Sequence, residues 1–257
     1  MLQKTTTVRA HRYRPSGIEE VEVQVSAEYH VAFLLNGRPY LTVACSGTDL
    51  ELLAAGHLAS EGIILSENEI ERIDIDEKGM TVNVITVRDA NIISRLIKVR
   101  TLVSGCAGGG GDSVCSLPVL HDLPELKAPV ILACAREFLG FSETYRLTHG
   151  VHSSALYDMQ GKRAAFFDEI GRHNAVDKLI GLALMRGVAV DRMMLFTTGR
   201  ISSEIVTKAV VAKVPVIVTR AAPTSMAVEL VRKLNIILIT GVKRDSFYVH
   251  HGIEYIS

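Results

Sequence analysis

Three segments in the second half of the chain share one pattern: a continuous apolar run, a short polar loop and then the start of a helix. They are FFDEIGRHNAVDKL (166–179), LFTTGRISSEIVTKA (195–209) and VIVTRAAPTSMAVEL (216–230). Continuous apolar runs are typical of strands whose sheet is covered by helices on both faces. The pattern therefore predicts an α/β structure built in layers.

The alternation of strands and helices extends over most of the second half. We expect strands at 150–157, 163–168, 193–198, 214–219 and 235–240, and helices at 172–187, 202–213 and 224–234. The first two strands follow each other without a helix between them, so the sheet should begin with a hairpin.

The first half of the chain has a different character. Between residues 6 and 45, short runs rich in Val, Thr and Tyr alternate with polar residues, as in antiparallel strands, and Asn36–Gly37 predicts a turn. Asp49 is expected to cap a helix that stops at Gly62, and GMTVNVITV (79–87) predicts a further strand.

The proline-bearing stretch DLPELKAPV separates the two patterns, and we place a domain boundary there. Residues 1–126 would form a smaller, β-rich α+β domain, and residues 127–257 a three-layer α/β domain. A chain of 257 residues is long enough for one or two domains.

The composition excludes several classes of protein. A hydrophobic fraction of 48%, a charged fraction of 22% and a net charge of zero indicate a globular protein, neither disordered nor a general nucleic-acid binder. No stretch approaches the roughly 20 apolar residues that cross a bilayer, and the N-terminus lacks the apolar core of a secretory signal. We therefore expect a cytoplasmic protein that binds neither membranes nor nucleic acids.

Each of the three loops carries an arginine: Arg172, Arg200 or Arg220. In open α/β sheets, ligands bind beyond the carboxyl ends of the strands, where helix N-termini favour anions. Because a guanidinium group matches phosphate oxygens, three such loops together would form a compact anion site. The alternative is that these arginines cap carbonyl groups or pair with nearby carboxylates. Those carboxylates are Asp168, Glu169 and Glu204.

The loop DEIGRHNAVDK holds more polar residues than a structural connector needs, which favours a binding role. THGVHSS adds a histidine pair that could bind a metal ion or donate to phosphate, although histidines at this spacing can also be ordinary polar residues. The candidate binding residues are Arg172, His173, Asn174, Asp177, Lys178, Gly199, Arg200, Ser202, Arg220, His149 and His152.

The four cysteines divide into two kinds. Cys45 ends an apolar strand and Cys134 lies in VILACARE, so both are expected to be buried. Cys106 and Cys115 flank four glycines in SGCAGGGGDSVC (104–115), which predicts a mobile loop because glycine loses the most backbone entropy on ordering. A thiol in such a loop could accept a sulfur atom from one partner and donate it to another, and the alternative is an exposed cysteine without a role.

The sequence does not favour a metal site. Structural zinc sites use four Cys or His ligands, usually in close pairs, whereas eight residues separate Cys106 from Cys115 and no paired motif accompanies them. The histidine-x-glutamate and proline-cysteine-x-x-cysteine signatures of zinc deaminases are absent from the sequence.

Four stretches of the sequence resemble the formate dehydrogenase accessory sulfurtransferases, the FdhD family. They are SGC (104–106), HGVHSSAL (149–156), DEIGRHNAVDKLIG (168–181) and TGRISSEIVTKA (198–209), and they follow the family's order along most of the chain. The DEIGRHNAVDK stretch is specific, whereas the glycine loop alone would be weak evidence.

The resemblance implies a cytidine-deaminase-like fold for the C-terminal domain, without the zinc chemistry of deaminases. It also implies that the chain is a sulfurtransferase, which takes sulfur from a cysteine desulfurase and passes it to the molybdenum or tungsten bis-guanine-dinucleotide cofactor that formate dehydrogenase requires. Cys106 would carry the persulfide, and Gly108–Gly111 would give its loop the necessary reach. The guanine nucleotides and pyrophosphates of this cargo would be the ligands of the arginine loops.

One departure from the family concerns the cysteines. Many members have cysteine-x-x-cysteine in this loop, whereas here the second position is Gly109 and the next cysteine is Cys115. Cys106 could act alone, or Cys115 could reach back across the glycines as a resolving thiol.

The size and pseudo-symmetry of the cofactor lead us to expect a symmetric homodimer. Two other functions stay open at this point. One is a chaperone that holds the cofactor and docks on the formate dehydrogenase catalytic subunit without transferring sulfur. The other is an enzyme that metabolises nucleotides.

Overall fold

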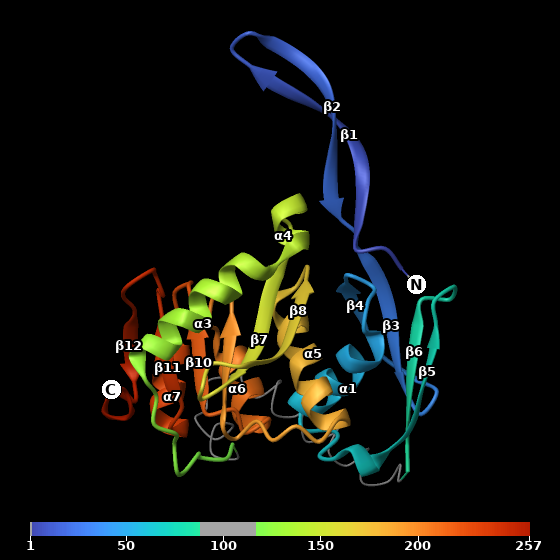
Figure 1. Cartoon of the computed structure of the whole chain (residues 1–257). Coiled ribbons are helices and arrows are strands. Elements are labelled where there is room, and N and C mark those ends of the chain that lie inside the picture. The colour runs from blue at the N-terminus through green and yellow to red at the C-terminus, as the bar shows by residue number, and fades with distance from the viewer. Residues whose placement is uncertain (1, 88–116) are drawn as a thin grey trace.

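The computed structural model describes residues 2–87 and 117–257, and its largest sheet has six strands in the order β12-β11-β10-β9-β7-β8 (Figure 1). These strands are β7 (His152–Asp158), β8 (Arg163–Glu169), β9 (Met193–Thr197), β10 (Val216–Thr219), β11 (Ile237–Thr240) and β12 (Tyr248–His251). β9, β10 and β11 are parallel, whereas β7 is antiparallel to β9 and β12 to β11. The predicted hairpin is confirmed as β7 and β8, and β12 is an additional strand.

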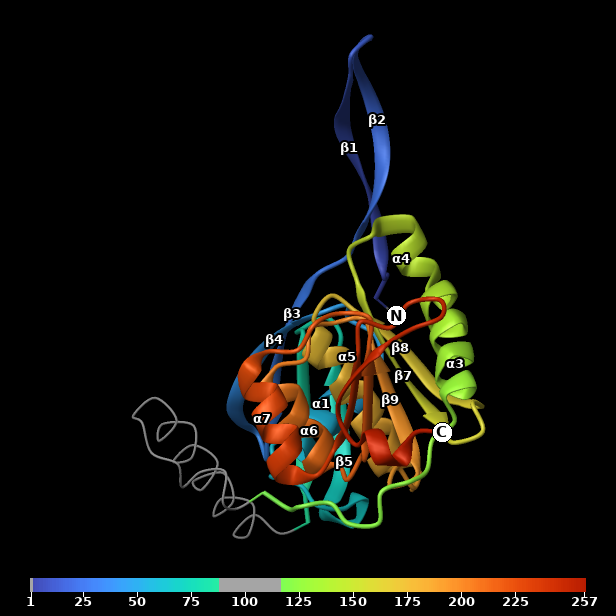
Figure 2. The same cartoon turned by 90° about the vertical axis from the view of Figure 1, so that its left-hand side faces the viewer.

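Helices cover both faces of this sheet, which gives the three layers expected from the sequence (Figure 1 and Figure 2). On one face lies α3 (Ala128–Phe141), and α4 (Glu143–Thr148) continues from it past the end of the strands towards the base of β2 (Gly17–Ser26). On the other face lie α5 (Arg172–Met185), α6 (Ser203–Val211) and α7 (Ser225–Leu234). The last three helices are those that the sequence predicts.

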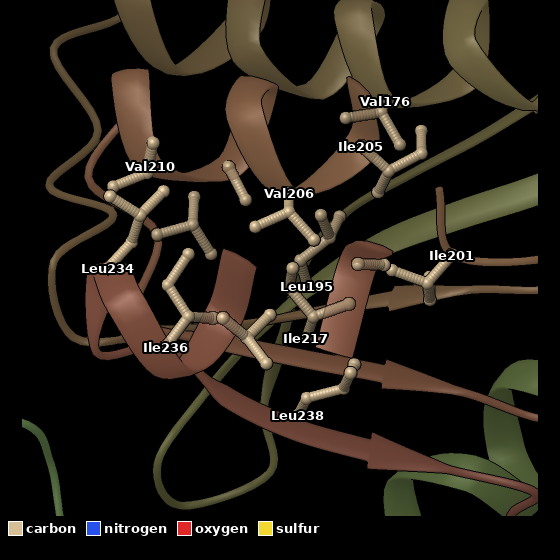
Figure 3. Close-up of a cluster of buried hydrophobic side chains, with 14 of the residues drawn as sticks. Val176, Leu195, Ile201, Ile205, Val206, Val210, Ile217, Leu234, Ile236 and Leu238 are labelled. Atoms are coloured by element: carbon tan, nitrogen blue, oxygen red, sulfur yellow. The ribbon is translucent and has the colours of Figure 1, made fainter. Parts of the chain in front are cut away.

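The core between the sheet and α5, α6 and α7 is built from the continuous apolar runs (Figure 3). Val176 of α5 and Ile205 and Val206 of α6 pack with Leu195 of β9 and Ile217 of β10, and all five side chains are at most 2% exposed. Because a second core fills the opposite face of the same strands, the runs are apolar at every position rather than at alternate ones.

The helix α3 is the main element that the sequence did not predict, since a connector is expected where α3 begins. Pro129 lies in its first turn, where the missing N–H of proline costs no helical hydrogen bond. Cys134 and Phe138 of α3 are buried in the second core, so the expectation that Cys134 is buried is confirmed.

The segment 117–126, which the sequence assigns to the end of the first domain, packs on the second half. The amide of Leu120 donates to the carbonyl of Leu234, and the amide of Leu126 donates to the carbonyl of Tyr255 in the short helix η3 (Ile253–Tyr255). The chain therefore reaches the second half before the predicted boundary.

The first half forms a four-stranded sheet, a helix and a separate hairpin. The elements are β1 (Thr5–Arg14), β2 (Gly17–Ser26), β3 (Tyr29–Leu35), β4 (Arg38–Cys45), α1 (Leu50–Ser60), η1 (Glu67–Glu69), β5 (Ile70–Asp76) and β6 (Thr81–Thr86). Among the described strands, β1 and β2 pair with each other alone, and their hairpin projects from the molecule (Figure 1 and Figure 2). At its base, the hydroxyl of Ser26 in β2 lies 2.9 Å from that of Thr148 in α4. The other strands have the order β4-β3-β6-β5, with β3 and β6 parallel.

Two local predictions for the first half have different outcomes. Asn36 and Gly37 form the turn between β3 and β4, with φ of 53° and 75°, as predicted. Asp49 precedes α1, but the prediction that its side chain caps the helix is wrong. Its backbone is left-handed, with φ of 50°, and its carboxylate lies 3.8 Å from Nζ of Lys178 instead.

The two halves of the chain meet where α1 crosses α5. At the crossing, Gly56 packs against the backbone of Asp177, and Gly181 packs against the backbone of Leu52. A Cβ atom on either glycine would collide with a carbonyl oxygen of the facing helix. Only glycine therefore lets the two backbones approach this closely.

We predict that Gly56→Ala or Gly181→Ala lowers the free energy of unfolding by about 3 kcal/mol or more, the upper end of the range for overpacked cores, because helix backbones cannot move aside as a flexible side chain can. Gly140→Ala in α3 is the control, since nothing lies within 4 Å of a Cβ at that position, and it should be neutral or slightly stabilising. Urea unfolding followed by circular dichroism measures the three values. Similar stabilities for all three variants would contradict the close crossing.

Candidate functional site

The candidate binding loops come together at one edge of the six-stranded sheet. The carboxyl ends of β8, β9 and β10 and the amino end of β7 all lie at this edge, because β7 runs antiparallel to both of its neighbours. His152 begins β7, the loop 198–202 follows β9, Arg220 follows β10, and α5 starts at Arg172 after β8. Ligands of open α/β sheets bind at this kind of edge.

A cavity of about 410 Å³ lies at this edge of the sheet, and we call it the edge cavity. It contains His149, His152 and Arg220 from the candidate set. Tyr145 of α4 also lines it, and the rings of Tyr145 and His149 meet edge to face with their centroids 5.1 Å apart. Aromatic edges and faces of this kind suit a flat ligand.

Two serines of the edge cavity were not singled out from the sequence. The hydroxyls of Ser142 and Ser153 both donate to the carboxylate of Asp168, at 2.7 and 2.6 Å. Their protons are thereby engaged, so their oxygens can act towards a ligand only as acceptors. The sequence carries no local signal for this arrangement, because it joins α4, β7 and β8 across the sheet.

His152 is held in the edge cavity by the loop after β9. Its Nδ1 lies 3.3 Å from Oγ1 of Thr198, which also accepts a hydrogen bond from the amide of Ser153. Burial, and then the charge of Arg172, lower the pKa of His152 below its usual value. The ring is therefore neutral at neutral pH and can take part in hydrogen bonds as donor and acceptor.

A second group of polar side chains lies where α5 and α6 begin, and we call Arg172, His173 and Ser202 the anion cluster. Nε of Arg172 and Oγ of Ser202 are buried and have no hydrogen-bond partner among the described residues. Nε2 of His173 is also buried and makes no hydrogen bond there, although Oε2 of the exposed Glu204 lies 3.0 Å away. Buried polar atoms are almost always hydrogen-bonded, so unpartnered ones indicate a place for a ligand or for water.

The helix ends beside the anion cluster also favour a negative ligand. Neither α5 nor α6 has a side chain that caps its N-terminus, so Ser202 sits at the N-cap of α6 without bonding the helix. The first N–H groups of a helix point outwards and carry partial positive charge. Burial, and then the charge of Arg172, lower the pKa of His173 although Glu204 opposes the shift, so Arg172 is the permanent cation of the cluster.

Gly199 joins the two helix starts. A Cβ atom at this position would lie 2.8 Å from Cβ of Arg172, so the absence of a side chain lets the loop after β9 pass directly over Arg172. The amide of Gly199 lies 3.3 Å from Oγ1 of Thr197, and its carbonyl accepts from the hydroxyl of Thr219 at 2.8 Å. The loop that bears Arg200 is therefore fixed from both neighbouring strands.

The carboxylates considered as alternative partners of the arginines are engaged by other residues. Asp168 accepts from two serines, as described above. Glu169 pairs with Lys178 at 2.6 Å, and Oε2 of Glu204 lies 3.0 Å from Nε2 of His173 without hydrogen-bond geometry. Arg200 and Arg220 are exposed.

The other three candidates on α5 are engaged inside the protein and line neither the edge cavity nor the anion cluster. Asn174 donates to the carbonyl of Ala44 at 2.8 Å. Asp177 and Lys178 are at most 1% exposed and form ion pairs inside the protein. The structure therefore places these side chains in the contact between α5 and the first half of the chain.

Asp177 is the centre of a buried polar network. It accepts from Nζ of Lys208 and from the hydroxyl of Ser60, both at 2.8 Å, and Nδ1 of His57 lies 3.2 Å away. Burial alone would raise the pKa of Asp177, but Lys208 and His57 outweigh it and lower the pKa. The carboxylate is therefore ionised and compensated.

The described cysteines are poor nucleophiles. Cys45 and Cys134 are buried, and burial raises the pKa of each thiol to about 11. The predicted carriers, Cys106 and Cys115, lie outside the described residues. Within residues 2–87 and 117–257, no group of three or more His, Cys, Asp or Glu side chains is arranged to hold a metal ion.

The helices of the described segments are too short or too polar to cross a membrane.

A family model and individual relatives of this chain indicate the same protein family. A model of the FdhD/NarQ family matches residues 26–257. The sulfur carrier protein FdhD of Bacillus subtilis is 33% identical over 261 residues, which cover 100% of this chain and 99% of that protein. The protein of the same name from Bacillus licheniformis is 32% identical over 256 residues, with 96% of each chain covered.

One solved structure shares the fold along the whole chain. The crystal structure of a formate dehydrogenase accessory protein from Desulfotalea psychrophila superposes with a TM-score of 0.81 at 25% sequence identity, and it covers 98% of this chain and 99% of its own. The order of sheets and helices described above is thus shared with that protein.

We predict that Lys208→Met lowers the free energy of unfolding by about 3–5 kcal/mol at pH 7, because it leaves the buried Asp177 carboxylate without its cation. The pKa of Asp177 is lowered in the folded state. The ionised carboxylate therefore stabilises the fold above the ordinary carboxyl pKa, and this stabilisation is lost as the pH falls through the pKa of the folded protein.

The stability difference between wild type and Lys208→Met should therefore shrink as the pH falls below about 4. Lys208→Met/Asp177→Asn should recover part of the loss at pH 7. Urea unfolding at several pH values measures these differences, and a difference independent of pH would contradict the assignment.

Proposed function

This chain belongs to the FdhD/NarQ family, and on that premise we propose that it is a sulfur carrier that serves the maturation of a formate dehydrogenase. The observation that carries the proposal is the full-length match to proteins named sulfur carrier protein FdhD. The structural likeness to a formate dehydrogenase accessory protein supports the same client.

Cys106 is the carrier of the sulfur in this proposal. Its thiolate attacks the outer sulfur of a persulfide on a cysteine desulfurase; a new S–S bond forms at Cys106, the old S–S bond breaks, and the desulfurase thiolate leaves. The buried thiols of Cys45 and Cys134, with their raised pKa values, are unsuited to this exchange. Cys115 is an auxiliary resolving thiol.

The acceptor is the bis-guanine-dinucleotide cofactor of molybdenum or tungsten, bound as cargo. On delivery the S–S bond at Cys106 breaks and the Cys106 thiolate leaves. The reduced metal of the cargo supplies the two electrons that turn the transferred sulfur into a sulfide ligand.

The site at the sheet edge fits such a cargo in two ways. The unpartnered atoms of Arg172 and Ser202 at two helix N-termini suit the pyrophosphate oxygens, and Nε2 of His173 lies between them and the exposed carboxylate of Glu204. The edge cavity suits a guanine base, because the rings of Tyr145 and His149 line it beside polar groups.

We also propose that the protein is a homodimer. A symmetric homodimer would offer one site to each nucleotide half of the pseudo-symmetric cargo. The second half of the chain, in the same proposal, has a cytidine-deaminase-like fold.

Incubation with a cysteine desulfurase and cysteine should add the mass of one sulfur atom to the protein, as measured by intact-protein mass spectrometry. We predict that Cys106→Ala abolishes this gain and that Cys115→Ala, the matched control from the same stretch, retains it. A reducing agent should remove the added mass, because a persulfide is reducible.

The same experiment separates the sulfur carrier from a chaperone that only holds the cofactor. The chaperone requires no persulfide on Cys106. Two results together would favour the chaperone: a mass gain that is absent or that survives Cys106→Ala, and normal activation of formate dehydrogenase by Cys106→Ala.

We predict that Arg172→Met weakens the binding of guanosine diphosphate by about tenfold to a hundredfold, the usual value of a hydrogen bond to a charged group. Arg186→Met, at the exposed other end of α5, removes the same charge far from the cluster and should leave the affinity unchanged. Isothermal titration calorimetry gives both dissociation constants. Equal losses in the two variants would indicate an effect of net charge and not a site.

A further inference from the structure

The turn between β8 and α5, residues 169–172, carries Arg172 into the anion cluster, and a loop from the first half of the chain holds it. The amide of Ser46 donates to Oε2 of Glu169 at 2.9 Å, and the hydroxyl of Ser46 donates to Oε1 of Glu169 at 2.8 Å. Oε2 of Glu169 also lies 3.1 Å from the amide nitrogen of Ile170, which is part of this turn. One buried carboxylate therefore ties the loop of the first half to the turn.

Lys178 completes this contact from the next turn of α5. Its Nζ lies 2.6 Å from Oε1 of Glu169 and 3.3 Å from the hydroxyl oxygens of both Ser46 and Thr48. Glu169 and Lys178 are each 0% exposed. A buried pair of this kind holds its geometry only while every partner is in place, because an unmatched buried charge is costly.

The loop that supplies these partners is itself in an unusual conformation. Gly47 and Asp49 both have left-handed backbones, with φ of 75° and 50°, and the carboxylate of Asp49 lies 3.8 Å from Nζ of Lys178. Glycine and aspartate are among the residues that adopt this conformation most readily, and it brings the loop round to the start of α1. The loop is shaped to meet Lys178 and Glu169.

We propose that Ser46 is a positioning residue for the anion cluster: through Glu169 and Lys178 it fixes the turn that aims Arg172, so the first half of the chain sets the anion affinity of the second. This inference rests on the proposed function of that cluster. Ser46 touches neither the edge cavity nor the cluster and acts only through Glu169 and Lys178.

A matched control exists in the second buried network between the same two halves. The hydroxyl of Ser60 donates to Asp177 at 2.8 Å and accepts from Lys208 at 2.7 Å, in the same way that Ser46 serves Glu169 and Lys178. Ser46 and Ser60 are 4% and 2% exposed. The carboxylate bonded to Ser46 ends β8 directly before the turn to Arg172, whereas the carboxylate bonded to Ser60 lies further along α5.

The test compares Ser46→Ala and Ser60→Ala in the full-length protein. Isothermal titration calorimetry with guanosine diphosphate, well below the melting temperature, gives the affinity, and thermal unfolding gives the stability. We expect both variants to lose similar stability, but only Ser46→Ala to bind about fivefold more weakly or worse, the effect of a misplaced charged hydrogen bond. Ser46→Thr, which keeps a hydroxyl, should recover part of the affinity.

Each outcome decides the proposal. Equal affinity in Ser46→Ala, Ser60→Ala and wild type overturns the positioning role and leaves the proposed function intact. If the wild-type protein does not bind guanosine diphosphate, the proposed cargo site fails and the inference fails with it. If Ser46→Ala does not fold, the near-isosteric Ser46→Cys replaces the hydroxyl by a weak hydrogen-bond donor, and an unchanged affinity in that variant overturns the proposal.

Discussion

The close crossing of α1 and α5 is the contact on which the rest of the structure depends. Gly56 and Gly181 bring the two helix backbones together without intervening side chains, and the two halves of the chain are joined there. α5 packs on the six-stranded sheet through residues such as Val176 and Leu179, so the crossing fixes α1 and its four-stranded sheet relative to the large sheet. Both the anion cluster and the edge cavity lie next to the start of α5.

Two buried ion pairs lie beside this helix crossing. Lys178 pairs with Glu169 near the start of α5, and Lys208 pairs with Asp177 beside the crossing. Buried ion pairs contribute little net stability compared with apolar packing, but breaking one is costly, so they select a single arrangement of the packed elements. Ser46 and Ser60 of the first half each bond to one of these pairs, and the Glu169–Lys178 pair also holds the turn that presents Arg172.

The second half was largely predictable from the sequence, because continuous apolar runs separated by short polar loops leave few alternatives to an α/β layer structure. The α3 helix was not, since Pro129 in its first turn resembles a break. Arg172 and His173 were found from their loop. Asp177 lies one turn further along the face of α5 that bears His173 and is paired with Lys208 of α6, whereas Lys178 is paired with Glu169. Residue type predicts a charged site, but only the helix register and the packing of α1 decide which charges face it.

The serines around Asp168 and the role of Ser46 could not be predicted for a different reason. Ser142, Ser153 and Asp168 lie on separate elements, and Ser46 reaches Glu169 across 123 positions of the chain. Contacts of this range depend on the final topology, and hydroxyl residues are too common for a motif to mark them.

A crystal structure of the protein with bound guanosine diphosphate tests the central claim most directly, namely that the edge where α5 and α6 begin is a binding site for the phosphates of a nucleotide cargo. The account predicts phosphate oxygens within hydrogen-bond distance of Nε of Arg172, Nε2 of His173 and Oγ of Ser202, with the base in the edge cavity. Phosphates bound elsewhere, with these three atoms hydrogen-bonded to protein or water alone, would contradict it.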